Sequence, residues 1–127
     1  MSALLDSLDR AVERFGEALA APETDLNRDA TIQRFESCFE LAWKAVQKVG
    51  RDEGLACSSP KDCLRLAFSQ GWLEDEAVWL TMLEDRNRTS HTYDEQFARQ
   101  LYGRLGGYRE PLAHLAARLR QVANRPL

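Results

Sequence analysis

This chain of 127 residues contains little of what breaks a helix, with only seven glycines and four prolines. Both residue types disfavour helix interiors, and no stretch alternates apolar and polar residues for long enough to indicate a strand. Apolar residues nevertheless make up 44% of the chain, which is enough to build one hydrophobic core. The composition therefore predicts an all-α protein and disfavours any fold based on a sheet.

Other absences narrow the class of protein further. No apolar run reaches the length of a membrane span, and the N-terminal residues read as an amphipathic helix, with no signal peptide. The cysteines, at positions 38, 57 and 63, are odd in number, form no CxxC motif and have no histidine close by. We therefore expect a soluble, cytoplasmic protein with reduced thiols, no membrane association, no metal and no other cofactor, in which Cys38 is a small core residue.

Charge gives no general attraction to nucleic acid, because 17 basic and 20 acidic side chains leave a formal net charge of −3. Any RNA binding must then come from a local basic cluster. The sequence also has no Gly-rich phosphate-binding loop and no paired histidines.

Apolar residues recur at three- and four-residue spacing along almost the whole chain. Ser59-Pro60 and Asp94 are helix start signals, and Gly106-Gly107 is a break. The expected helices cover residues 2–20, 25–49, about 59–70, from 74 or 75 into the segment that starts at 86, and 94–105, with a last apolar segment over 112–122. We predict one domain, residues 1–127, folded as an antiparallel four- to five-helix, up-and-down bundle. The three tryptophans are expected in the core or at an interface, with Trp72 and Trp79 as candidates for a dimer interface.

One segment interrupts this pattern. The sequence Arg-Asn-Arg-Thr-Ser-His-Thr-Tyr, residues 86–93 and hereafter the polar run, stands where the buried stripe of Trp79, Met82 and Leu83 should continue. Arg86 and His91 lie about 140° apart around a straight helix, so they share a face only if the helix ends or bends between them. The Thr-Ser pair at 89–90 is typical of such an ending.

An arginine and a histidine together suit phosphate chemistry without a metal. Arg86 would hold the phosphate, His91 would move a proton, and on RNA the 2′-hydroxyl would be the nucleophile. Asn87 could orient either group, and Tyr93 could stack on a base or present its hydroxyl. The alternative is structural: Arg86 pairs with Glu36 or Glu40 and pins two helices together. In that case His91 has only a structural role at the end of a helix. The other histidine, His114, is expected to lie on the surface.

These residues carry a family resemblance. Arg86-x4-His91-x-Tyr93 resembles the signature of the HEPN superfamily. Two longer blocks are similar to those of the nucleotidyltransferase substrate-binding protein family. The first block comprises Ile32-Gln33-Arg34-Phe35-Glu36 and Phe39-Glu40-Leu41-Ala42-Trp43-Lys44, and the second is Arg86-Asn87-x-Thr89-Ser90-His91-Thr92-Tyr93-Asp94.

The resemblance implies a homodimeric helical bundle that pairs with a separately encoded minimal nucleotidyltransferase and serves as its substrate- or nucleotide-binding subunit. It implies that Glu36 and Glu40 support the site, and that the binding residues are Arg86, Asn87, Ser90, His91 and Tyr93. The chain lacks the transferase's own Gly-Ser and paired-aspartate motif, so it should not transfer nucleotides by itself.

Relatives in the wider superfamily imply an alternative function, a metal-independent RNase toxin of a toxin–antitoxin pair. In that case Arg86 and His91 are catalytic across the dimer, RNA is the substrate, and Tyr93 is the residue that the partner transferase modifies with a nucleotide. Arg88 occupies a variable position of the motif and is a candidate phosphate contact.

Overall fold

The computed structural model describes residues 2–91 and 93–125, and these form six α-helices and no strand. The helices are α1 (Ala3–Ala20), α2 (Asp25–Asp52), α3 (Pro60–Ser69), α4 (Glu76–His91), α5 (Glu95–Leu105) and α6 (Arg109–Ala123). The predicted all-α bundle is confirmed, and the last apolar segment forms a separate helix after the glycine pair. Thr92 of the polar run lies outside the described residues.

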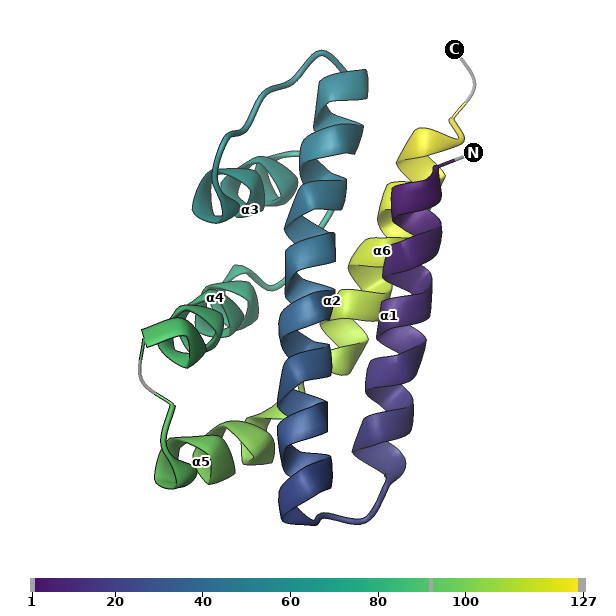
Figure 1. Ribbon diagram of the computed structural model, residues 1–127. Coiled ribbons are helices and arrows are strands. Elements are labelled where there is room, and N and C mark those ends of the chain that lie inside the picture. Colours follow the sequence, from purple (N-terminus) through teal and green to yellow (C-terminus); the bar gives the residue numbers. More distant parts are fainter. Residues whose placement is uncertain (1, 92, 126–127) are drawn as a thin grey trace.

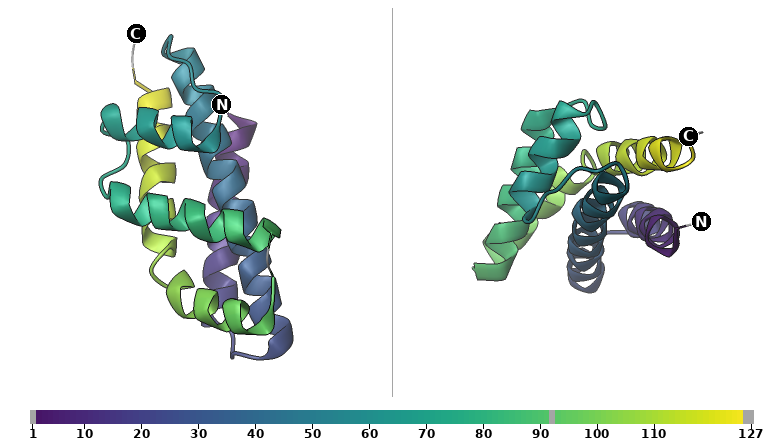
Figure 2. Two further views of the ribbon diagram at one scale, coloured as in Figure 1. Left: turned by 90° about the vertical axis from the view of Figure 1, so that its left-hand side faces the viewer. Right: turned by 90° about the horizontal axis from the view of Figure 1, so that it is seen from above.

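The helices form two layers (Figure 1). Helices α1, α2 and α6 lie side by side, while α3, α4 and α5 are stacked across them in a second layer (Figure 2). Helix α2 is the centre of the fold, because it packs against every other helix. Helices α3, α4 and α5 thus cross α2 and do not run up and down beside it.

Local sequence signals explain where most helices begin. Side-chain oxygens of Ser2, Thr24, Ser59 and Asp94 accept hydrogen bonds from backbone N–H groups in the first turns of α1, α2, α3 and α5. These caps satisfy backbone donors that a helix start otherwise leaves unpaired. At its other end, helix α2 runs three residues beyond the predicted end, through Gly50 to Asp52.

The hydrophobic core extends from the space between α1, α2 and α6 into the space between the two layers, and it takes the apolar stripe of every helix. Trp72 and Trp79 belong to it, with exposed fractions of 5% and 2%. The expectation that they form a dimer interface is therefore wrong, because their ring surfaces are already covered within one chain. Cys38 is fully buried, as expected, and burial raises the pKa of its thiol to about 12.

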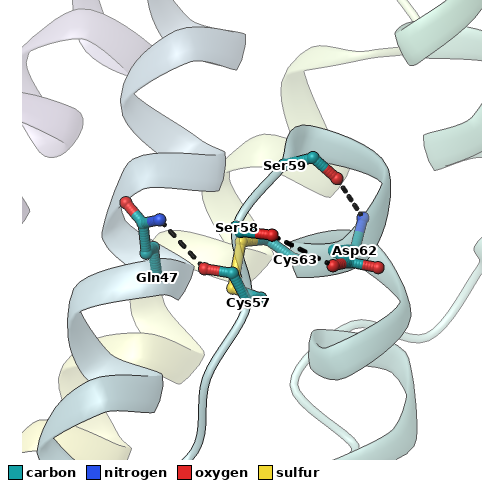
Figure 3. Close-up of a disulfide and its surroundings, with 6 residues drawn as sticks. All are labelled: Gln47, Cys57, Ser58, Ser59, Asp62 and Cys63. Atoms are coloured by element: carbon teal, nitrogen blue, oxygen red, sulfur yellow. Dashed lines mark hydrogen bonds between the residues drawn. A yellow bond between two sulfur atoms is a disulfide. The ribbon is translucent and has the colours of Figure 1, made fainter.

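The other two cysteines differ from the expectation. Cys57, in the segment before α3, forms a disulfide with Cys63 in the first part of α3 (Figure 3). The Gln47 side-chain amide of α2 donates a 2.9 Å hydrogen bond to the Cys57 carbonyl oxygen. The prediction of reduced thiols is thus wrong for this pair. The spacing allows the two cysteines to lie near each other but does not by itself indicate a bond, and the helix start at Ser59-Pro60 is what turns Cys63 back toward Cys57.

Within the described residues, no helix combines the length and the apolar character that crossing a bilayer requires.

Candidate functional site

The polar run lies along one face of α2. Three acidic residues of α2, namely Asp29, Glu36 and Glu40, are spaced by seven and four positions, which places them on one side of the helix. We call them the acidic stripe. Each contacts a different residue of the polar run, so the run is fixed to α2 along its length.

Arg86 is held from three sides. Its guanidinium donates to Glu40 in an ion pair and to the Asn87 side-chain oxygen at 3.1 Å, and its Cζ lies 6.0 Å from the centre of the Phe39 ring. The side chain of Arg86 remains 26% exposed and that of Glu40 34% exposed. Arg86 is therefore a half-buried cation with one carboxylate partner and an open side toward solvent.

Glu36, which was one of the two predicted partners of Arg86, contacts Thr89 instead. The Thr89 hydroxyl lies 2.9 Å from Glu36 Oε2 and 2.7 Å from the Arg86 carbonyl oxygen. The Ser90 hydroxyl also lies near that carbonyl, at 3.4 Å. Of the two predicted supporting carboxylates, Glu40 contacts Arg86 directly, and Glu36 reaches the polar run through Thr89.

These contacts also explain why α4 does not end at Thr89. The hydroxyls of Thr89 and Ser90 bond back to the preceding turn, which lets both residues remain helical, and α4 continues to His91. The expected ending or bend between Arg86 and His91 does not occur. The two side chains consequently leave the helix about 140° apart and do not meet within one chain.

Tyr93 follows α4 and returns to α2. Its hydroxyl donates a 2.9 Å hydrogen bond to Asp29 Oδ1, while the residue as a whole stays 49% exposed. Partial burial, the hydrogen bond to Asp29 and the charges of Asp29 and Glu36 raise the pKa of Tyr93 to about 12. The phenol is therefore neutral at physiological pH, with a carboxylate in place to accept its proton.

The outer side of α4 carries exposed polar groups. Asn87, Ser90 and His91 are all exposed. Arg88 is exposed as well, and its Cζ lies 4.4 Å from the centre of the buried Phe97 ring, which orders its side chain through a cation–π contact. Sequence reasoning noted Arg88 as a phosphate contact but gave no sign of Phe97 beneath it.

A buried polar cluster beside the site escaped sequence reasoning. Asp85, only 5% exposed, accepts two hydrogen bonds from Arg104 at 2.7 and 3.1 Å and one from the Tyr108 hydroxyl at 2.5 Å. This cluster ties α4 to α5 and to the start of α6. The signal was available, since Asp85 follows Met82 by three positions and so extends the buried stripe of α4.

Two further features bear on the chemistry. Among residues 2–91 and 93–125, no group of three His, Cys, Asp or Glu side chains is placed to hold a metal ion. A cavity of about 830 Å³ lies between the α3–α4 connection and α6, where Trp79, His114 and Arg118 contribute to its lining. The polar run, as far as it is described, does not line this cavity, so we place the candidate site on the open surface of α4.

Comparison with known proteins agrees with this picture. Residues 3–121 match the family described as "Nucleotidyltransferase substrate binding protein like". A crystal structure from Thermus thermophilus is 39% identical, with a TM-score of 0.82 over 89% of this chain and 98% of that one. A Haemophilus influenzae structure, titled as the fold of a substrate binding domain of a nucleotidyltransferase, is 27% identical, with a TM-score of 0.80 over 92% of this chain and 99% of that one.

A curated Haemophilus influenzae protein named "Probable ribonuclease HepT" is 30% identical over 95 residues. The match covers 71% of this chain and 65% of that protein, so it spans slightly less than two thirds of the relative. Because the family match extends over nearly the whole chain, the predicted resemblance is confirmed. The chain belongs to the nucleotidyltransferase substrate binding protein like family.

Proposed function

We propose that this chain is a substrate- or nucleotide-binding subunit that forms a homodimer and pairs with a separately encoded minimal nucleotidyltransferase. The observation that carries the proposal is how the polar run is held. Its inner side is fixed to the acidic stripe of α2, while Asn87, Ser90, His91 and Tyr93 stay exposed. A polar surface that is both ordered and open is what recognition of a partner or nucleotide requires.

The proposed roles follow from the contacts. Arg86 keeps N–H donors beyond those bound to Glu40 and Asn87, and these would bind a phosphate in a charge-assisted manner. Asn87, Ser90 and His91 would supply further hydrogen bonds from the same part of α4. Glu40 and Glu36 would hold Arg86 and Thr89 in place.

Tyr93 is the proposed site of nucleotide modification by the partner. Its hydroxyl oxygen would attack the α-phosphorus of a nucleoside triphosphate, an O–P bond would form, and pyrophosphate would leave. The phenolic proton would pass to Asp29, which already accepts it in a hydrogen bond. The catalytic centre and its metal would belong to the transferase.

The test is to purify the tagged chain from its native host and weigh the intact complex by native mass spectrometry. We expect a dimer of this chain with a bound protein that carries the Gly-Ser and paired-aspartate motif. Arg86→Gln or Tyr93→Phe should weaken the complex, whereas Arg118→Gln, an exposed change on α6, should not. A chain that is always recovered without any such transferase would contradict the proposal.

A second function, a metal-independent RNase of a toxin–antitoxin pair, is favoured by one observation, the 30% identity to the protein named as a ribonuclease. Arg86 would stabilise the phosphate and His91 would transfer the proton of the 2′-hydroxyl. The chain has two histidines, and His114 is exposed on α6 beside Glu110. His91→Ala should abolish cleavage of RNA in the presence of a chelator, while His114→Ala should cleave at the wild-type rate. Equal cleavage by both variants would exclude this function.

A cytoplasmic location completes the proposal, because a nucleoside triphosphate and RNA are both available there. The Cys57–Cys63 disulfide is then expected to be reduced for at least part of the protein's life. Fractionation of the native host would test this location.

A further inference from the structure

A second polar concavity lies on a different face of α2. It has a volume of about 320 Å³ and is formed by α1 and α2. Its lining residues are Ser7, Arg10, Ala11, Arg14, Arg34 and Ser37. We call it the arginine groove, because it brings together three arginines and two hydroxyl groups and includes no acidic side chain.

The groove is separate from the polar run. Arg34 and Ser37 lie roughly a third of a turn around α2 from the acidic stripe. On α1, Asp6 and Asp9 pair with Arg120 of α6 and do not line the groove. The two faces of the protein can therefore be tested independently.

None of the three arginines forms an ion pair with another described residue. Within the part of the chain that the structure describes, none of them has a carboxylate oxygen within ion-pair distance. Arg28 and Arg120 contrast with them, since each is paired with two carboxylates. In a protein with a net charge of −3, three unpaired guanidinium groups around one concavity form a local positive potential.

Hydrogen bonds order the groove and leave donors available. Arg34 reaches from α2 to α1, where its Nη1 donates a 2.8 Å hydrogen bond to the Arg14 carbonyl oxygen. Arg10 Nη2 lies 3.5 Å from Ser7 Oγ. Each guanidinium has five N–H donors, so most of the donors in the groove remain free for a ligand.

We propose that the arginine groove binds a ligand with two or more adjacent phosphate groups, either the phosphate chain of a nucleotide or consecutive phosphates of a single nucleic-acid strand. Guanidinium groups bind phosphate through paired, charge-assisted hydrogen bonds, and the two serines add neutral donors. A single carboxylate would leave two of the three positive charges unmatched. The proposal does not depend on the function assigned to the polar run.

The test is to measure binding at low ionic strength with three probes, ATP, a short single-stranded oligoribonucleotide and citrate, and to locate it by the amide NMR signals of residues 7–14 and 34–37. We expect saturable binding of ATP or of the oligoribonucleotide. Arg10→Gln and Arg34→Gln should each weaken it about tenfold or more, because each removes charge-assisted hydrogen bonds.

Two controls separate this site from general attraction. Arg118→Gln removes one exposed arginine of α6, and Arg65→Gln removes one exposed arginine of α3. Both should change the affinity by about twofold or less, since neither residue lines the groove. Melting curves of all variants should confirm that they are folded.

Each result has a defined meaning. If ATP binds and the oligoribonucleotide does not, the ligand is the phosphate chain of a nucleotide. If the oligoribonucleotide binds more tightly than ATP, the ligand is a single nucleic-acid strand. The proposal is overturned if neither probe saturates, if citrate binds as tightly as the better phosphate probe, or if Arg118→Gln weakens binding as much as Arg34→Gln does. If the signals that shift are those of α4 alone, ligand binding belongs to the polar run and the groove proposal fails.

Discussion

The Tyr93 hydroxyl donates a hydrogen bond to Asp29, a residue 64 positions earlier in the chain, and so joins the segment after α4 to the first turns of α2. The carboxylate accepts this proton and, as a neighbouring negative charge, disfavours the phenolate. Both effects act together with partial burial to raise the pKa of Tyr93 to about 12.

Asp29→Asn should therefore lower the pKa of Tyr93 toward its ordinary value, because it removes a negative charge. NMR titration of ring-labelled tyrosine would follow Tyr93 separately from Tyr102 and Tyr108. In the wild type the raised pKa contributes stability that is fully present below pH 10 and is lost as the pH rises toward 12. An unchanged titration in Asp29→Asn would mean that burial and the remaining charges, including Glu36, set this pKa without Asp29.

The Arg86–Glu40 ion pair should contribute measurably to stability. A double-mutant cycle with Arg86→Gln and Glu40→Gln, followed by urea unfolding, should give a coupling of about 1 kcal/mol, because both side chains are partly shielded from water. The exposed pair Arg99–Glu95 is the control and should give about 0.3 kcal/mol. Equal couplings would argue against a supporting role for Glu40.

The Asp85 cluster should matter more than any surface charge. Asp85→Asn should lower the free energy of unfolding by about 3 kcal/mol, because Arg104 and the buried Tyr108 hydroxyl lose a charged acceptor. Glu84→Gln is the matched control, since Glu84 is the adjacent residue and is exposed. If both variants unfold at the same urea concentration, the cluster does not stabilise the fold.

Thiol labelling should distinguish Cys57 from the other two cysteines. In native protein purified without reductant, we expect no labelling, because Cys57 and Cys63 are joined and burial keeps the Cys38 thiol protonated. Mild reduction should expose the half-buried Cys57 to the reagent, while the fully buried Cys38 and Cys63 should stay unreactive in the folded protein. It should also lower stability by about 2 kcal/mol through the loss of a short loop constraint. Labelling of Cys57 before reduction would show that the disulfide does not form.

Most of the fold was predictable because its signals are local. The apolar period of residues 2–20 and the start signals at Ser59 and Asp94 depend only on neighbouring residues, and the helices appear where they indicate. The contact between Glu40 and Arg86 was also within reach, since helix periodicity places both on the sides that face each other.

The rest depends on contacts between distant segments. Thr89 and Ser90 favour a helix end by intrinsic preference, but their bonds to the Arg86 carbonyl and to Glu36 keep α4 helical. The hydrogen bond from the Arg34 guanidinium to the Arg14 carbonyl oxygen likewise depends on how α1 and α2 pack, which a single sequence does not show.

The persistence of α4 as far as His91 has a kinetic consequence. The side chains of Arg86 and His91 leave α4 on different sides, so we expect a reaction that uses both residues on one phosphate group to need two copies. Its rate per chain should then fall on dilution and recover on concentration, in the manner of a reaction that depends on dimer formation. A reaction that one copy performs by itself should keep the same rate per chain at every concentration. Protein concentration is thus a variable that tests, without any mutation, whether RNA cleavage uses residues of two copies.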